Sequence, residues 1–86
     1  MTTREEISRW FDKGIETGRR YMVVMCDTFD YSDYPMYFDT ESVARAAIAS
    51  PGEMTRFMEA YDLQADKAEQ LKVRRANCFA RQEQTP

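Results

Sequence analysis

The segment that most constrains the fold is Arg20–Phe38, where two apolar runs flank an acidic and aromatic turn. The first run, residues 21–28, is rich in strand-forming residues and apolar at nearly every position, which predicts a strand that is covered on both faces or covered by a partner subunit. Residues 29–34 form the turn. Pro35 cannot donate a ladder hydrogen bond, so the return strand at about 35–38 is expected to be a short edge strand. The segment therefore predicts an antiparallel β-hairpin.

The residues before the hairpin have the pattern of an amphipathic helix. Thr3 and Glu6 form a capping box that starts this helix near Arg4. Gly18 favours the left-handed backbone conformation that ends many helices, so the helix should end near Thr17. The apolar stripe expected to face the core consists of Ile7, Trp10, Phe11 and Ile15.

Two helix signals follow the hairpin. Asp39 or Thr40 can cap a helix over residues 42–49. Its buried face is expected to comprise Val43, Ala46 and Ala47. The sequence Ser-Pro-Gly-Glu at 50–53 then combines an N-cap serine, a proline at the first helical position and a glutamate at the third, and predicts a helix that ends near Asp62. The apolar stripe of this helix would consist of Met54, Phe57, Met58 and Tyr61.

The C-terminal third predicts a helix over about 66–74, an extended segment to residue 80 that adds a third strand, and a frayed tail at 81–86. With 86 residues the chain has room for one hydrophobic core. We expect an α+β fold: a small single domain over 1–86, ordered over about 3–80. It would contain an N-terminal helix, an antiparallel β-hairpin and two or three further helices.

The composition disfavours an enzyme. The chain has no histidine, the commonest general base and metal ligand, and no glycine-rich phosphate loop. Cys26 and Cys78 form no CxxC pair and are expected to be part-buried thiols in a reducing cytosol. The acidic neighbours of Cys26 would raise its pKa and disfavour the thiolate. We therefore expect no catalytic residues, no cofactor and no metal site.

The hydropathy pattern indicates a cytoplasmic protein. No apolar run approaches the roughly 20 residues of a membrane span, and no signal-like apolar segment follows the N-terminus. We expect no membrane association.

The candidate binding site is the turn CDTFDYSDYP at 26–35, where aspartates recur every three residues between aromatic residues. Residues 21–44 contain five acidic side chains and no basic ones. Exposed aromatic rings among carboxylates offer rigid anchors and charge complementarity to a partner with a basic surface. The residues expected to bind such a partner are Asp27, Phe29, Asp30, Tyr31, Asp33 and Tyr34. The structural alternative is that the aspartates initiate the turn and the tyrosines pack across the hairpin.

Two further interpretations use basic residues. The stretch KVRRANCFAR at 72–81 could contact phosphates, but a net charge of −3 makes direct nucleic-acid binding unfavourable. A small-molecule binder would instead sequester a nucleotide signal at an oligomer interface, stacking the base on an aromatic ring. Its phosphate ligands would be Arg19, Arg20, Arg74 and Arg75. A homodimer is also expected, because the core is small and the first strand nearly all apolar.

The motifs of the chain resemble those of a group of short bacteriophage and prophage proteins. The shared pattern is a WF-x-x-G helix, a strand ending in CDTFDY-x-DYP and a helix near FMEAYDL, and it covers about residues 10–79. The residues that carry it are Trp10, Phe11, Gly14, Gly18, Cys26 to Tyr31 and Asp33 to Pro35. The group has no established activity. The resemblance implies a viral accessory protein of the host cytoplasm that binds a host protein, such as an anti-CRISPR-like inhibitor of a host defence system.

Overall fold

The computed structural model describes residues 3–73 and 76–79. Within them the elements follow the order α1 (Arg4–Glu16), β1 (Tyr21–Asp27), β2 (Ser32–Phe38), α2 (Glu41–Ala49), β3 (Thr55–Asp62) and α3 (Lys67–Lys72). The three strands form one antiparallel sheet in the order β2-β1-β3, so β1 is the central strand. The expected α+β fold, with its N-terminal helix and β-hairpin, is confirmed.

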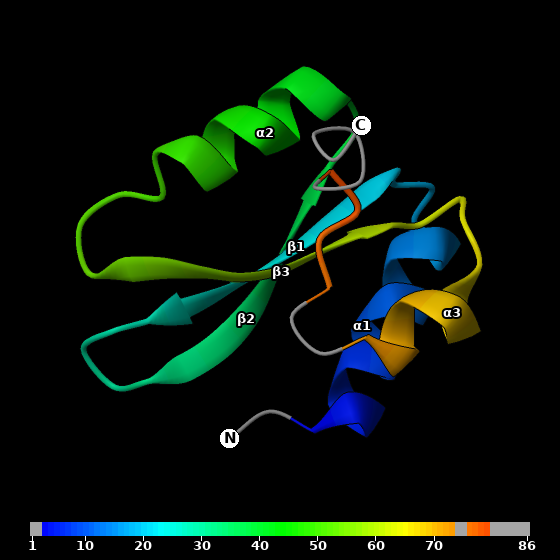
Figure 1. The fold of residues 1–86 in the computed structure, drawn as a ribbon, viewed down its shortest axis with the longest axis horizontal. Helices are drawn as coiled ribbons and strands as arrows, with labels where there is room; N and C mark the ends of the chain where they lie inside the picture. Colours follow the sequence, from blue (N-terminus) through cyan, green and yellow to red (C-terminus); the bar gives the residue numbers. More distant parts are fainter. Residues whose placement is uncertain (1–2, 74–75, 80–86) are drawn as a thin grey trace, which may run out of the picture.

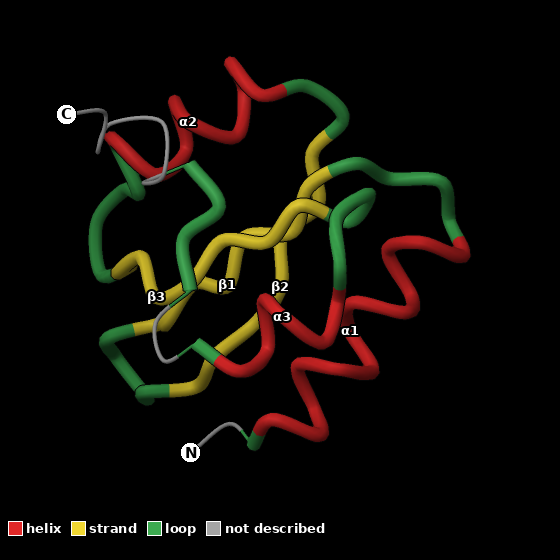
Figure 2. Tube along the Cα trace, turned by 45° about the vertical axis from the view of Figure 1, so that its right-hand side comes forward, coloured by secondary structure: helices red, strands yellow, loops and turns green. Residues whose placement is uncertain are grey.

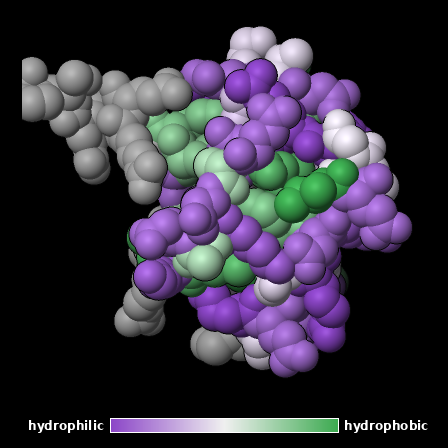
Figure 3. Space-filling model, turned by 90° about the vertical axis from the view of Figure 1, so that its right-hand side faces the viewer, coloured by the Kyte–Doolittle hydropathy of each residue, from purple (hydrophilic) through white to green (hydrophobic). Residues whose placement is uncertain are grey.

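Helices cover both faces of the sheet (Figures 1 and 2). Helix α2 lies over one face, and α1 with α3 lies over the other. Seen from the end where α1 and α3 lie in Figure 1, apolar residues form a green band between hydrophilic surfaces (Figure 3). Because helices cover both faces of the sheet, every residue from 21 to 26 in β1 is buried. The expectation that β1 is covered on both faces is confirmed, and the cover comes from the chain's own helices.

The sheet separates two hydrophobic clusters. The α1-side core is formed by Ile7, Phe11, Met22, Val24, Tyr61, Leu63 and Ala76. The α2-side core is formed by Tyr21, Val23, Met25, Ala44, Ala60 and Phe79. Alternate residues of β1 enter opposite clusters, as the two-residue period of a strand requires.

Helix α1 begins where the sequence predicts. The hydroxyl of Thr3 accepts a 3.1 Å hydrogen bond from the amide of Glu6. The expected stripe is only partly right: Ile7 and Phe11 are buried, but Ile15 is half exposed. Gly14 takes the fourth place on the buried face, because the helix passes too close to Leu63 and Tyr37 for a larger residue.

The hairpin is confirmed, with a shorter turn and a longer second strand than predicted. The loop comprises residues 28–31, and β2 already begins at Ser32. Strand β2 is an edge strand, and Pro35 pairs with Val24. The carbonyl of Tyr37 accepts a 3.0 Å hydrogen bond from the Arg19 guanidinium.

Helix α2 presents a different face to the sheet from the one predicted. Ala44 is fully buried, whereas Val43 and Ala46 are exposed. Ala47 and Ile48 pack against the α2-side core. The small side chain of Ala44 lets the helix lie close to the sheet, and this rotates Val43 into solvent.

The predicted helix through residue 62 is wrong, because this segment forms strand β3. Ser50 is the C-cap of α2, not the N-cap of a new helix, and its amide donates a 3.0 Å hydrogen bond to the carbonyl of Ala46. Gly52 then adopts a φ of +90° and Met54 a φ of +56°, and the chain turns back along the second edge of β1.

A β-bulge explains why β3 looks helical in the sequence. Val24 pairs with Glu59 while Met25 pairs with Phe57, so Met58 is an extra residue on β3. Phe57 packs on the α2-side core and Met58 on the α1-side core, where Tyr61 also lies. The bulge breaks the two-residue alternation, so that apolar residues recur at a spacing typical of a helix.

Helix α3 lies within the predicted range of 66–74 and is capped by Asp66. After it, residues 76–79 run beside β3. The amide of Ala60 donates to the carbonyl of Ala76 at 2.8 Å, and the amide of Cys78 donates to the carbonyl of Ala60 at 3.1 Å. The predicted extra pairing is therefore one isolated parallel bridge between Ala60 and Asn77, and the third strand of the sheet is β3. The predicted frayed tail lies outside the described residues.

In the part of the chain that the structure describes, no helix has the length and apolar character needed to cross a bilayer.

Candidate functional site

Two aspartates shape the loop between β1 and β2. The carboxylate of Asp27 accepts a 2.8 Å hydrogen bond from the amide of Phe29, and the carbonyl of Asp27 accepts one of 2.6 Å from the amide of Tyr31. The carboxylate of Asp30 accepts bonds from the hydroxyl of Ser32 at 2.7 Å and from its amide at 3.0 Å. These bonds, the hydroxyl first, lower the pKa of Asp30. The role of Asp27 and Asp30 is thus to fold the turn, as the structural interpretation predicts.

The loop holds two aromatic rings in solvent. Phe29 is 77% exposed and Tyr31 is 72% exposed. Tyr31 also has a φ of +59°, in the left-handed region that costs a non-glycine residue about 1–2 kcal/mol. Packing does not account for this conformation, because the ring lies outside both cores.

The other two predicted residues lie on β2 and not on the loop. Tyr34 is half-buried and packs against the α2-side core. Asp33 pairs with Cys26, and both lie on the face of the sheet opposite to Tyr34. The structure therefore brings Asp27, Phe29, Asp30 and Tyr31 together at the loop and assigns Tyr34 to the core.

A second loop, residues 50–54, lies beside the first at the same end of the molecule (Figure 1). The amide of Thr28 donates a 2.9 Å hydrogen bond to the carbonyl of Met54. Met54 is 54% exposed, and Glu53 is exposed beside it. The predicted helix covers this loop, although the Pro-Gly dipeptide at 51–52 is a turn signal. We call Phe29, Asp30, Tyr31, Glu53 and Met54 the two-loop surface.

The carboxylates at this end are not neutralised by the described part of the chain. Among the described residues, none of the four acidic side chains here forms a salt bridge; they are Asp27, Asp30, Asp33 and Glu53. Several acidic residues elsewhere are paired: for example, Asp39 lies 2.8 Å from Arg19, and Glu41 lies 2.8 Å from Arg45. Residues 27–33 and 50–56 together carry four acidic side chains and one basic side chain, Arg56, so these two segments have a net negative charge.

The predicted phosphate ligands are not assembled into a site by the described residues. The Arg19 guanidinium is held by Asp39 and by the carbonyl of Tyr37. Arg20 lies over the ring of Tyr21, 5.2 Å from its centroid. Arg74 and Arg75 lie outside the described residues. The geometry of Arg19 fits a structural role.

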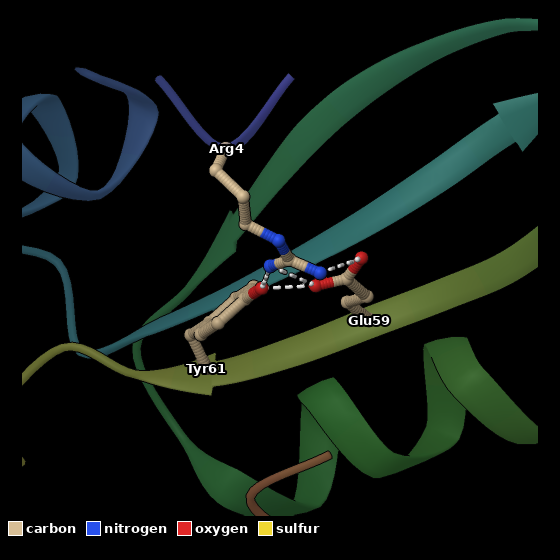
Figure 4. Close-up of polar contacts among 3 residues, drawn as sticks. All are labelled: Arg4, Glu59 and Tyr61. Atoms are coloured by element: carbon tan, nitrogen blue, oxygen red, sulfur yellow. Dashed lines mark hydrogen bonds and ion pairs between the residues drawn. The ribbon is translucent and has the colours of Figure 1, made fainter. Parts of the chain in front are cut away.

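The buried carboxylate of Glu59 belongs to a network with Arg4 and Tyr61 (Figure 4). Glu59 is only 8% exposed, and its two carboxylate oxygens accept from the Arg4 guanidinium at 3.0 and 3.3 Å. The Tyr61 hydroxyl accepts from Arg4 at 2.8 Å and donates to Glu59. Burial raises the pKa of Tyr61, so it stays protonated. The network satisfies the buried carboxylate and fastens the start of α1 to β3, which is a structural function.

Both cysteines are free thiols, as predicted. Cys26 is buried and Cys78 is half-buried. Burial raises the pKa of Cys78 from 9.0 to about 12. Burial, and then a hydrogen bond with Asp33, raises the pKa of Cys26. Neither thiol has the depressed pKa of a nucleophile. Among the described residues, no three Cys, Asp or Glu side chains are grouped so that they could hold a metal ion.

Comparison with protein-family models, with curated proteins and with solved structures finds no match for this chain.

Proposed function

We propose that this protein is a non-enzymatic binding protein that holds another protein through the β1–β2 loop. The observation that carries the proposal is the exposure of Phe29 and Tyr31, at 77% and 72%, on a loop whose carboxylates have no salt bridge with any described residue. Large exposed aromatic side chains are costly to leave in water and are enriched where proteins bind one another.

The loop is built to present these rings. The hydrogen bonds of Asp27 and Asp30 fix its backbone, so little conformational freedom is lost when Phe29 and Tyr31 enter a partner. A left-handed Tyr31 is a strained residue that the fold tolerates at its surface, as is common at binding sites. The surrounding negative charge favours a partner with a basic surface and speeds the encounter.

The resemblance to bacteriophage proteins supports a biological setting for this binding. In our proposal the chain is a phage-encoded accessory protein in the host cytoplasm, and the partner is a host protein. A partner that belongs to a defence complex would make the protein an anti-CRISPR-like inhibitor. This part of the proposal depends on the resemblance and not on the geometry of the loop.

The test is affinity capture from the host, followed by quantitative mass spectrometry and by binding measurements with the purified partner. We expect Phe29→Ala with Tyr31→Ala to weaken binding at least tenfold, because two aromatic anchors each typically contribute more than about 1 kcal/mol. Val43→Ala is the matched control, since Val43 is exposed on α2 outside the loop. Asp27 and Asp30 are left unchanged because they fold the turn. A partner that binds the double variant as tightly as the unmodified protein would exclude the loop as the site.

A further inference from the structure

We infer that the loop of residues 50–54 is the second half of the binding surface, and that the partner protein offers an apolar pocket flanked by Lys or Arg side chains. Met54 would enter this pocket beside the two aromatic rings. The inference rests on the proposed function and extends it to the chemistry of the partner.

The two loops form one continuous surface. The amide of Thr28, next to Phe29, donates a 2.9 Å hydrogen bond to the carbonyl of Met54. Asp27 and Thr55 are paired in the sheet directly beneath the loops. Both loops lie at the same end of the sheet in two views of the molecule (Figures 1 and 2). A partner that contacts Phe29 would therefore also reach residues 53 and 54.

Met54 has the properties of an anchor. The residue is 54% exposed and belongs to neither core, although its backbone adopts a left-handed φ of +56°. Methionine is flexible and polarisable, which lets it fit pockets of irregular shape. Together with Phe29 and Tyr31 it places three large exposed apolar residues on two adjacent loops, as expected of an interaction surface.

The charge selects the class of partner. Glu53 adds a carboxylate on the second loop to Asp30 on the first, and neither has a salt bridge within the described chain. Like charge would oppose a second copy of this chain, a nucleic acid or an anionic membrane at this surface. A protein with basic side chains around an apolar pocket complements both the charge and the apolar groups.

The defined probe is a synthetic peptide in which arginine and leucine alternate, titrated into the isotopically labelled protein and followed by NMR. We expect the amide chemical shifts to change in both loops, at residues 28–31 and 50–55. A matched arginine–serine peptide should bind more weakly because it lacks apolar groups, and a glutamate–leucine peptide should not bind. If the arginine–serine peptide bound as tightly as the arginine–leucine peptide, the inference of an apolar pocket would be overturned. If the glutamate–leucine peptide bound as tightly, the inference of a basic partner would be overturned.

Two variants separate this inference from the proposed function. Met54→Ala should lower the affinity for the arginine–leucine peptide about fivefold or more, as expected for an interface anchor. Val43→Ala, which alters a side chain of the same 54% exposure on α2, should leave binding unchanged. Shifts confined to residues 28–31 with no effect of Met54→Ala would overturn the inference and leave the proposed function standing. Shifts in neither loop would overturn both.

Discussion

The Arg4 guanidinium donates hydrogen bonds to both oxygens of the Glu59 carboxylate, across 55 positions of sequence. Arg4 lies in the first turn of α1, and Glu59 lies on β3 beside the bulge. The contact therefore fixes the N-terminal helix against the strand that follows the loop of residues 50–54. Its contribution to stability can be measured independently of any partner.

Arg4→Met should destabilise the fold. The substitution leaves the buried Glu59 carboxylate with Tyr61 as its remaining described partner, and the loss should be about 1–3 kcal/mol, since Arg4 is partly exposed to water. Urea unfolding followed by circular dichroism measures the change. Arg9→Met is the control, because Arg9 forms only an exposed pair with Glu5 at 3.9 Å and should change stability by less than about 0.5 kcal/mol. Equal stability of the two variants would show that the network does not support the fold.

The sequence predicted the parts of the fold that local signals determine. The Thr3 cap, the strand after Gly18 and the edge strand with Pro35 depend on backbone chemistry within a few residues, and all three are confirmed. The predicted buried faces of α1 and α2 are less accurate than these predictions. The observed faces depend on a close approach at Gly14 and Ala44 to elements that are distant in the sequence.

Strand β3 could not be predicted from its own residues. A bulge at Met58 gives this segment helical periodicity, and the segment is a strand because it pairs with the second edge of the nearly all-apolar β1. The same error hid half of the candidate site. The predicted helix has Met54 on its buried stripe, whereas Met54 lies exposed on a loop.

Gly14→Ala should destabilise the protein although alanine favours helix. An added Cβ would lie 2.6 Å from Leu63 Cδ1 and 2.8 Å from Tyr37 Cε1, and Tyr37 is held by a 2.7 Å hydrogen bond to the carbonyl of Trp10. The overpacking costs about 1–3 kcal/mol against a helix-propensity gain of about 1 kcal/mol, so thermal unfolding should occur at lower temperature. Lys13→Ala, at an exposed site of the same helix, should have little effect. A Gly14→Ala variant more stable than the original would mean that Leu63 and Tyr37 repack freely.

Tyr31→Asn should separate binding from stability. Asparagine tolerates the left-handed φ of +59° better than tyrosine does, and little packing is lost because the ring is exposed. The free energy of unfolding should therefore stay constant or rise by up to about 1 kcal/mol. Partner binding should fall. Tyr34→Asn is the matched control on the same hairpin and should be destabilising, because Tyr34 packs against the α2-side core. A loss of stability in Tyr31→Asn would contradict a strained, solvent-directed ring.

The pKa of Asp30 should lie below its ordinary value of 3.8. A carboxyl with a lowered folded-state pKa stabilises the protein above its unfolded pKa, and this contribution disappears as the pH falls through the folded-state pKa. The order of the loop should therefore persist through pH 4 and be lost only in stronger acid, as followed by NMR titration of the carboxyl carbon. Ser32→Ala removes the hydroxyl donor and should move the pKa of Asp30 back towards 3.8. Ser42→Ala, on α2, should leave it unchanged, and an equal effect of both substitutions would rule out the Ser32 contact as the cause.

The two thiols should react only when the protein unfolds. Burial raises the pKa of Cys78 from 9.0 to about 12 and also raises that of Cys26, so the native protein holds very little thiolate at pH 8. Because a raised pKa favours the protonated form in the folded state, the stabilising effect is present at neutral pH and is lost in strong alkali. With Ellman's reagent we expect labelling of the native protein to be at least a hundredfold slower than that of the protein in guanidinium chloride. A Cys26→Ser variant reports on Cys78 alone. Rapid labelling of that variant under native conditions would show that residues 76–79 separate readily from β3, because Cys78 is shielded where its amide pairs with Ala60.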